Sequence, residues 1–219
     1  MFVIADIAGE LNALMRLVER IPKGRQIVLV GDLIDRGPSS KEVVAWAIEN
    51  KDSVITLKGN HEDMMLDWYY KTNIYDRGIW LDNGGDKTLI SYGATNGMTE
   101  DSVRNLIPVE HMEFLASCPL YFLSEGAVVT HAPIAKRHGL ITDALDILTW
   151  NKRTELSVLW NRGMPKRREH YQIFRHNSHW GLDKIIDAEG EFAICLDGSR
   201  AKKLTGILWP EQEIFQEDY

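Results

Sequence analysis

The apolar residues of the N-terminal half form short continuous runs that alternate with longer amphipathic stretches. Short runs of this kind are typical of buried strands, and apolar residues at helical spacing are typical of helices packed on a core. The runs cover residues 2–5, 27–30 and 54–57, and the helical stretches cover 10–20, 40–49 and the residues around Met64, Met65 and Trp68. Strand and helix alternating in this way predict a parallel sheet with helices on its faces.

Residues 71–107 interrupt the alternation, because they are rich in Gly, Asn, Asp and Thr. We interpret them as a partly helical insertion that caps the edge of the sheet. Beyond them the pattern predicts a helix at 108–117, a hairpin of 121–124 and 127–130, and later strands at 184–187, 192–196 and 206–209. We therefore expect one α/β domain over residues 1–219, with a cap at about 71–107.

The charge balance argues against long nucleic acids as partners, since 25 basic and 32 acidic residues give a net charge of −7. The one visible basic cluster, Lys166-Arg167-Arg168, is expected to be a solvated loop. Cys118 and Cys195 lie in apolar surroundings and are expected to be reduced core residues. No targeting run precedes Asp6 and no stretch is long enough to cross a bilayer, so we expect a cytoplasmic protein with no membrane partner.

Polar residues suited to binding metal or phosphate follow each of the first three predicted strands. In open α/β sheets, ligands bind beyond the carboxyl ends of the strands, so these residues should come together. Any one of the pairs Gly-Asp or Gly-Asn would usually be no more than a turn. The residues are Asp6 after the first strand, Asp32, Asp35 and Arg36 after the second, and Asn60 and His61 after the third. Three such turns in succession indicate a site.

The same residues carry a family resemblance. Residues 31–37 read Gly-Asp-Leu-Ile-Asp-Arg-Gly and residues 59–62 read Gly-Asn-His-Glu. Both match signatures of the phosphoprotein-phosphatase branch of the calcineurin-like metallophosphoesterases, and the chain resembles small bacterial and phage members such as the lambda phage protein phosphatase and symmetrical diadenosine tetraphosphate hydrolases. The resemblance implies an α/β fold with α+β-like layers, in which a central β-sandwich of mixed sheets is flanked by helices.

The resemblance also implies two divalent metal ions bridged by Asp32. Asp6 would complete one metal site, while Asn60, His131 and His176 would complete the other. Carboxylate, amide oxygen and imidazole suit Mn²⁺, with Fe or Zn²⁺ as alternatives, better than Ca²⁺. Two such ions about 3.5–4 Å apart would hold a hydroxide for in-line attack on phosphorus. At His176 the chain has Arg175-His176-Asn177 where the family has Gly-His-Thr, so His179 competes with it as a ligand.

The remaining roles follow from the same resemblance. Arg36 and Arg162 would clamp the phosphoryl oxygens, helped by Asn60, because guanidinium binds them in bidentate fashion. His61 would protonate the leaving oxygen, and Asp35 would orient His61 and favour its charged form. The resemblance therefore implies a phosphoester hydrolase.

One expected ligand is missing. The family's first motif is Gly-Asp-x-His-Gly, whereas this chain has Ala5-Asp6-Ile7-Ala8-Gly9, and a methyl group cannot bind a metal. Ala8 is either a deliberate substitution that silences turnover or a natural feature of a member with one weakened metal site. The otherwise intact set of residues favours the first explanation.

Three functions are consistent with this set of residues. The first is metal-dependent hydrolysis of phosphomonoesters, as in phosphoserine or phosphothreonine of proteins, impaired by Ala8. The second is symmetrical cleavage of dinucleoside polyphosphates, or removal of nucleotide-like caps from RNA. The third is a phosphate-binding module with little turnover, against which the retained His61 and Asp35 argue. The cap at 71–107 is expected to decide the substrate.

Overall fold

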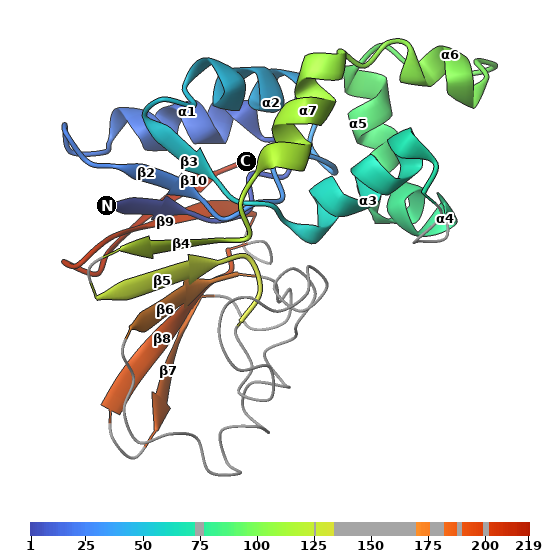
Figure 1. Ribbon diagram of the computed structural model, residues 1–219. Helices are drawn as coiled ribbons and strands as arrows, with labels where there is room; N and C mark the ends of the chain where they lie inside the picture. Colours follow the sequence, from blue (N-terminus) through green and yellow to red (C-terminus); the bar gives the residue numbers. More distant parts are fainter. Residues whose placement is uncertain (73–76, 125, 134–169, 176–181, 188–189, 199–201) are drawn as a thin grey trace.

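The computed structural model describes residues 1–72, 77–124, 126–133, 170–175, 182–187, 190–198 and 202–219. Within them the chain forms two five-stranded sheets. Figure 1 shows the helices gathered over one face of the first sheet and the second sheet on its other face. Each sheet contains both parallel and antiparallel pairs, so the predicted layers of mixed sheets flanked by helices are confirmed.

The N-terminal half follows the predicted order of strand and helix. Its elements are β1 (Phe2–Ile4), α1 (Leu11–Glu19), β2 (Ile27–Leu29), α2 (Ser40–Glu49), β3 (Val54–Thr56) and α3 (Asn60–Tyr70). β1, β2 and β3 pair in parallel, as predicted. Parallel neighbours joined by helices bring the carboxyl ends of all three strands to one edge, where the polar residues follow.

The stretch between β3 and the second sheet is mostly helical where it is described, with turns and irregular segments at 92–99 and 105–108. It contains α4 (Arg77–Trp80), the π-helical turn η1 (Leu81–Gly85), α5 (Asp86–Ser91), α6 (Glu100–Arg104) and α7 (Val109–Ser117). The helix predicted at 108–117 is thereby confirmed. The role of residues 71–107 as a cap over the edge of the sheet remains a prediction.

The second sheet has the order β4-β5-β6-β8-β7, and the first is completed as β10-β9-β1-β2-β3. β5, β6 and β8 are parallel, with β4 and β7 as antiparallel edges. The bounds are β4 (Tyr121–Ser124), β5 (Ala127–Thr130), β6 (Tyr171–Phe174), β7 (Leu182–Asp187), β8 (Gly190–Leu196), β9 (Lys203–Leu208) and β10 (Glu213–Asp218). The hairpin and the three later strands were predicted, whereas β6 and β10 were not.

The core is divided between the two faces of the first sheet. Phe2 and Ile4 of β1 are buried against the helices, whereas Val3 between them is buried against the second sheet. Side chains of a strand point to alternate faces, so one strand serves both layers. Burying each such side chain stabilises the fold by about 1.5–3 kcal/mol.

Two smaller expectations concern the cysteines and the membrane. Cys118 and Cys195 are both buried thiols outside any disulfide, as predicted. Among the described residues, no helix combines the length and the apolar character needed to span a bilayer.

Candidate active site

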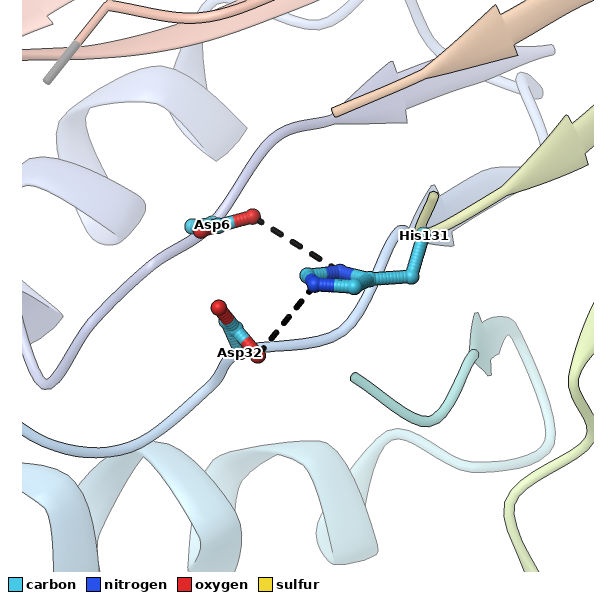
Figure 2. A group of neighbouring side chains, drawn as sticks. All are labelled: Asp6, Asp32 and His131. Atoms are coloured by element: carbon cyan, nitrogen blue, oxygen red, sulfur yellow. Dashed lines mark ion pairs between the residues drawn. The ribbon is translucent and has the colours of Figure 1, made fainter. Parts of the chain in front are cut away.

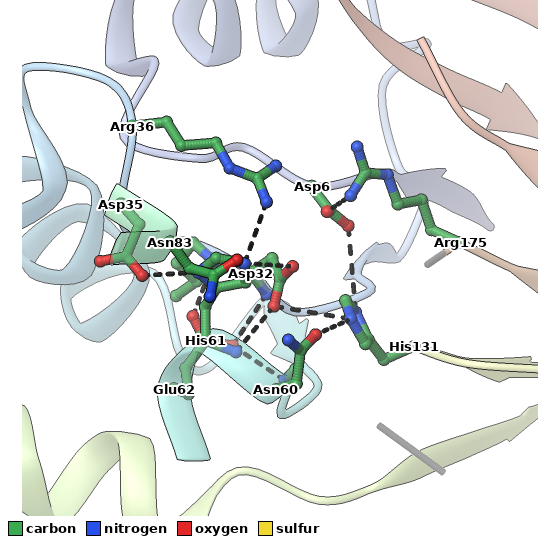
Figure 3. A network of polar contacts seen from close by, with 12 residues as sticks. Asp6, Asp32, Asp35, Arg36, Asn60, His61, Glu62, Asn83, His131 and Arg175 are labelled. Carbon is green, nitrogen blue, oxygen red and sulfur yellow. Dashed lines mark hydrogen bonds and ion pairs between the residues drawn. The ribbon is translucent and has the colours of Figure 1, made fainter. Parts of the chain in front are cut away.

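Five strands of the two sheets deliver polar residues to one place (Figure 3). Asp6 follows β1, Asp32 follows β2, Asn60 and His61 begin α3 after β3, His131 follows β5 and Arg175 follows β6. All six of these residues are buried. Arg36 joins them from the loop after β2, and its side chain is exposed. The site therefore depends on the packing of the two sheets against each other.

Two glycines allow the loops after β2 and β3 to approach closely. Gly31 has φ +100°, and a Cβ added there would lie 2.4 Å from the backbone nitrogen of Gly59. A Cβ on Gly59 would lie 2.2 Å from Oδ1 of Asp32. The positive φ of Gly31 and the very short contacts at both positions require glycine.

Glu62 holds the same two loops together. Its Oε2 accepts hydrogen bonds from the backbone nitrogens of Asp32 and Gly59, both at 2.8 Å, and its Oε1 accepts one from Leu33 at 2.8 Å. Burial and the neighbouring Asp32 raise the pKa of Glu62 to about 7, against the opposing effect of the three N–H groups. Its role is to fix the backbone under Asp32 and Asn60.

His131 is held with one ring nitrogen facing the site. Its Nδ1 lies 3.0 Å from the carbonyl oxygen of Val30, which can only accept, so Nδ1 carries the proton. Burial lowers the pKa of His131 and favours the neutral ring. Its Nε2 then presents a lone pair to Oδ1 of Asn60 at 3.0 Å and Oδ1 of Asp32 at 3.5 Å. A carbonyl partner behind a ligand histidine is the arrangement that fixes its orientation at metal sites.

We call Asp32, Asn60 and His131 the acceptor cluster. Three groups that each offer a lone pair at these distances can share one cation. Asp6 adds a carboxylate oxygen 3.9 Å from the ring of His131, and ligand atoms of Asp6, Asp32 and His131 lie within 4.8 Å of one another (Figure 2). Carboxylate, amide and imidazole are a donor set that binds Mn²⁺, Fe or Zn²⁺. The described residues thus fit one divalent ion.

The opposite side of Asp6 differs, and we call Asp6, Ala8 and Arg175 the Asp6 edge. The guanidinium of Arg175 forms an ion pair with Oδ2 of Asp6, and its other terminal nitrogen lies 3.5 Å from Oδ1 of Asp197. The side chains of Asp6, Arg175 and Asp197 are buried. Figure 3 shows Arg175 directed at Asp6. Position 8 supplies only a methyl group, so the described residues do not fit a second ion here.

His61 sits in a network that leads away from the acceptor cluster. Its Nδ1 lies 2.5 Å from Oδ2 of Asp35, as expected for a pair in which the carboxylate orients the ring. Its Nε2 lies 3.2 Å from Nη2 of Arg36. Burial lowers the pKa of His61, but Asp32 and Asp35 together outweigh that effect and raise it.

Asp35 is itself held by groups that the sequence did not single out for this purpose. Nε1 of Trp80 donates to Oδ2 of Asp35 at 2.9 Å, and Oγ1 of Thr88 donates to Oδ1 at 2.5 Å. Both donors come from the 71–107 segment. These two donors hold the buried carboxylate of Asp35 in place, which makes it a good orienting group for His61.

The structure brings together most of the predicted site residues. Asp6, Asp32, Asn60 and His131 gather around one point, and Asp35, Arg36 and His61 lie beside them. Arg162, His176 and its competitor His179, and the cluster Lys166-Arg167-Arg168, lie outside the described residues. The chemical roles of all these residues remain predictions.

Four contributing residues were missed. Glu62 belonged to the matched motif and could have been found there, and Arg175 stood at a visible departure from the family pattern. Trp80 and Thr88 lie where no periodicity pointed to a role.

Comparison with known proteins agrees with this geometry. The symmetrical bis(5'-nucleosyl)-tetraphosphatase of Aliivibrio fischeri is 29% identical over 204 residues, which cover 90% of this chain and 69% of that protein. Serine/threonine-protein phosphatase 2 of Escherichia coli is 38% identical over 88 residues, covering 39% of this chain and 38% of its own. The crystal structure of a putative diadenosine tetraphosphatase superposes with a TM-score of 0.67 at 20% identity, covering 100% of this chain and 93% of that one, which shows the fold.

The model of one protein family matches most of the sequence. It is described as calcineurin-like phosphoesterase and covers residues 1–191 of the 219. Its members depend on divalent metals, consistent with the acceptor cluster. The chain therefore belongs to the calcineurin-like phosphoesterase family and is a phosphoric ester hydrolase.

Proposed function

We propose that the chain hydrolyses phosphomonoesters, such as phosphoserine or phosphothreonine in proteins, with a divalent metal ion, Mn²⁺ being the best candidate. One observation carries the proposal: the acceptor cluster lies next to a histidine–carboxylate pair and an arginine. Metal ligands alone would serve a structural ion. An acid for the leaving group and a clamp for phosphate serve hydrolysis.

Each residue has a task that its surroundings support. Asp32, Asn60 and His131, with Asp6 beside them, would hold the ion, and His176 is proposed to join them. The ion supplies Lewis-acid stabilisation of the phosphoryl oxygens and lowers the pKa of a bound water. Arg36, with Arg162 and Asn60, would bind the phosphoryl oxygens.

Arg36 also connects substrate binding to the acid. In the structure its Nη2 lies 3.2 Å from Nε2 of His61, and a hydrogen bond between them requires that Nε2 holds no proton. When Arg36 turns to the phosphoryl oxygens, Nε2 is released to carry a proton for the leaving oxygen. Asp35 keeps the ring in place and stabilises its charged form.

The test exploits the leaving group. In the His61→Asn variant, hydrolysis of a phosphoserine peptide should fall by about 10²–10⁴-fold, because the alkoxide leaves poorly without a proton. Hydrolysis of p-nitrophenyl phosphate should fall far less, since p-nitrophenolate leaves unprotonated. His170→Asn, on an exposed histidine, is the matched control and should change neither rate. An equal loss on both substrates would refute the acid role.

A second candidate is cleavage of dinucleoside tetraphosphates, favoured by the relative from Aliivibrio fischeri that carries this activity in its name. Rates on diadenosine tetraphosphate, a phosphoserine peptide and a capped RNA, measured with Mn²⁺, would rank the substrates. A dinucleotide preferred over the peptide would replace the first proposal. Metal and phosphate bound without turnover of any substrate would leave only the binding module.

A further inference from the structure

Two departures from the family's motifs meet at one carboxylate. Ala8 stands where the first motif has a histidine, and Arg175 stands where a later motif has glycine. They are 167 positions apart in the sequence, yet both border Asp6, and Arg175 pairs with it. One change removes a metal ligand, and the other adds a cation at the same place.

We propose that the guanidinium of Arg175 takes the place of one of the family's two metal ions, so that this chain binds a single divalent ion at the acceptor cluster. The inference rests on the proposed metal-dependent function. It treats Ala8 and Arg175 as one compensated change, which makes Ala8 a natural feature of the chain rather than an engineered one.

The burial of the charges supports the exchange. The side chains of Asp6 and Asp197 are each 1% exposed, and that of Arg175 is 7% exposed. Two carboxylates this deeply buried need a positive partner, because an unpaired buried charge is strongly destabilising. A guanidinium suits the position since it stays charged and offers donors in several directions. With Arg175 in place, Oδ2 of Asp6 already has a cationic partner.

The backbone fixes Arg175 where it must be. β5 and β6 pair in parallel with Thr130 opposite Phe174, and the backbone nitrogen of Arg175 donates to the carbonyl oxygen of His131 at 2.9 Å. Arg175 is therefore anchored next to the acceptor cluster by its main chain, and its side chain reaches the neighbouring position. The remaining site keeps its own ligands.

The space beside Ala8 allows the family's histidine to be put back at position 8. A cavity of ≈ 450 Å³ is lined by Asp6, Ala8, Arg175, Lys202 and others, so a larger side chain at position 8 has room. Ala8 has φ +49°, a conformation that histidine adopts more readily than branched residues do. The family's histidine can thus be restored, but its metal ion would still meet Arg175.

The test counts metal ions. The chain and its variants are equilibrated with Mn²⁺, dialysed and analysed for bound manganese. We expect one ion per chain in the native protein, one in Ala8→His, and two in Ala8→His combined with Arg175→Gly. Two ions in the native protein, none in it, or one in the double variant would each overturn the proposal.

Electron paramagnetic resonance of the native protein with Mn²⁺ gives an answer even where the double variant fails to fold. An isolated ion shows resolved hyperfine structure, as we expect, whereas an exchange-coupled pair would refute the proposal. The matched control is Lys202→Gln, which removes another cation from the same cavity. Combined with Ala8→His it should leave the count at one, and a count of two would show that Arg175 has no special role.

These results are separable from the proposed function. One bound ion without hydrolysis of any substrate would end the proposed function and leave the inference standing. Hydrolysis with two ions bound to the native chain would support the proposed function and overturn the inference.

Discussion

The acceptor cluster and the Asp6 edge lie within one site but keep the family pattern to different degrees. The cluster retains Asp32, Asn60 and His131, supported by Glu62 and by two glycines that no other residue can replace. The Asp6 edge has lost a ligand and gained a buried ion pair. On the proposal above, neighbouring halves of a metal site diverge separately as long as the buried charge stays balanced. The variants below test how independent they are.

The largest effect is expected on the acceptor cluster itself. Gly59→Ala places a Cβ 2.2 Å from Oδ1 of Asp32, so the carboxylate must move. We expect hydrolysis and Mn²⁺ affinity to fall by at least about 100-fold, as for loss of support around a metal ligand. Steady-state kinetics and metal titration measure both.

Gly97→Ala is the control for this variant. Its Cβ meets nothing within 4 Å, although its φ of +87° is unfavourable for alanine. It should lose about 1 kcal/mol of stability and keep its activity. Full activity in Gly59→Ala would show that the cluster tolerates displacement as well as the Asp6 edge does.

A smaller effect is expected from the support behind His61. Trp80→Phe removes one donor to Asp35 and keeps an aromatic ring in the core. We expect roughly a 10-fold loss of turnover on substrates with poor leaving groups, by analogy with other supporting hydrogen bonds. The bound metal should be unchanged.

The pH profile of turnover distinguishes a positioning role of Trp80 from a general loss of structure. The profile should shift, because Asp35 stabilises the charged form of His61. Trp46→Phe, a partly buried tryptophan packed on the same core, serves as the control. A loss that is equal for good and poor leaving groups would contradict the role given to Trp80.

The smallest effect is expected on the pH dependence of stability, from a histidine outside both the acceptor cluster and the Asp6 edge. Nδ1 of His111 in α7 lies 2.8 Å from the hydroxyl of Tyr92, and burial lowers the pKa of His111. The folded chain then binds fewer protons at this residue than the unfolded chain does. Stability should fall as the pH drops below the ordinary histidine value of 6.5.

His111→Gln should flatten that part of the pH dependence, measured by urea unfolding at several pH values. Bound manganese and turnover should stay as in the native chain. Altered metal binding in this variant would mean that α7 communicates with the site, and the comparison would have to include it.

The sequence predicted the elements that carry strong patterns. The runs before Asp6, Asp32 and Asn60 were long and apolar enough to identify β1, β2 and β3, and the motifs placed their side chains together. β6 and β10 were missed for different reasons. β6 has four residues and little alternation, and β10 is a polar edge strand with half-buried side chains. Both depend on neighbours far away in the sequence.

The site was predictable where a local motif carried it. Asn60, His61 and Glu62 stand together in the sequence, and their chemistry can be inferred from it. The contact of Arg175 with Asp6 joins two sheets, and the donors that Trp80 and Thr88 offer to Asp35 come from a segment without a clear pattern. Charge balance and long-range hydrogen bonds of this kind become visible only once the chain is folded.

The pairing of β1 has a consequence for biosynthesis. β1 lies between β2 and β9, and Ile4 pairs with Gly206 on the second side. During translation the first strand emerges with one hydrogen-bonding edge open until residues 203–208 have left the ribosome. An open edge is a template for pairing with other chains. A folding intermediate in which β9 has not yet paired therefore exposes an aggregation-prone edge in the middle of the first sheet.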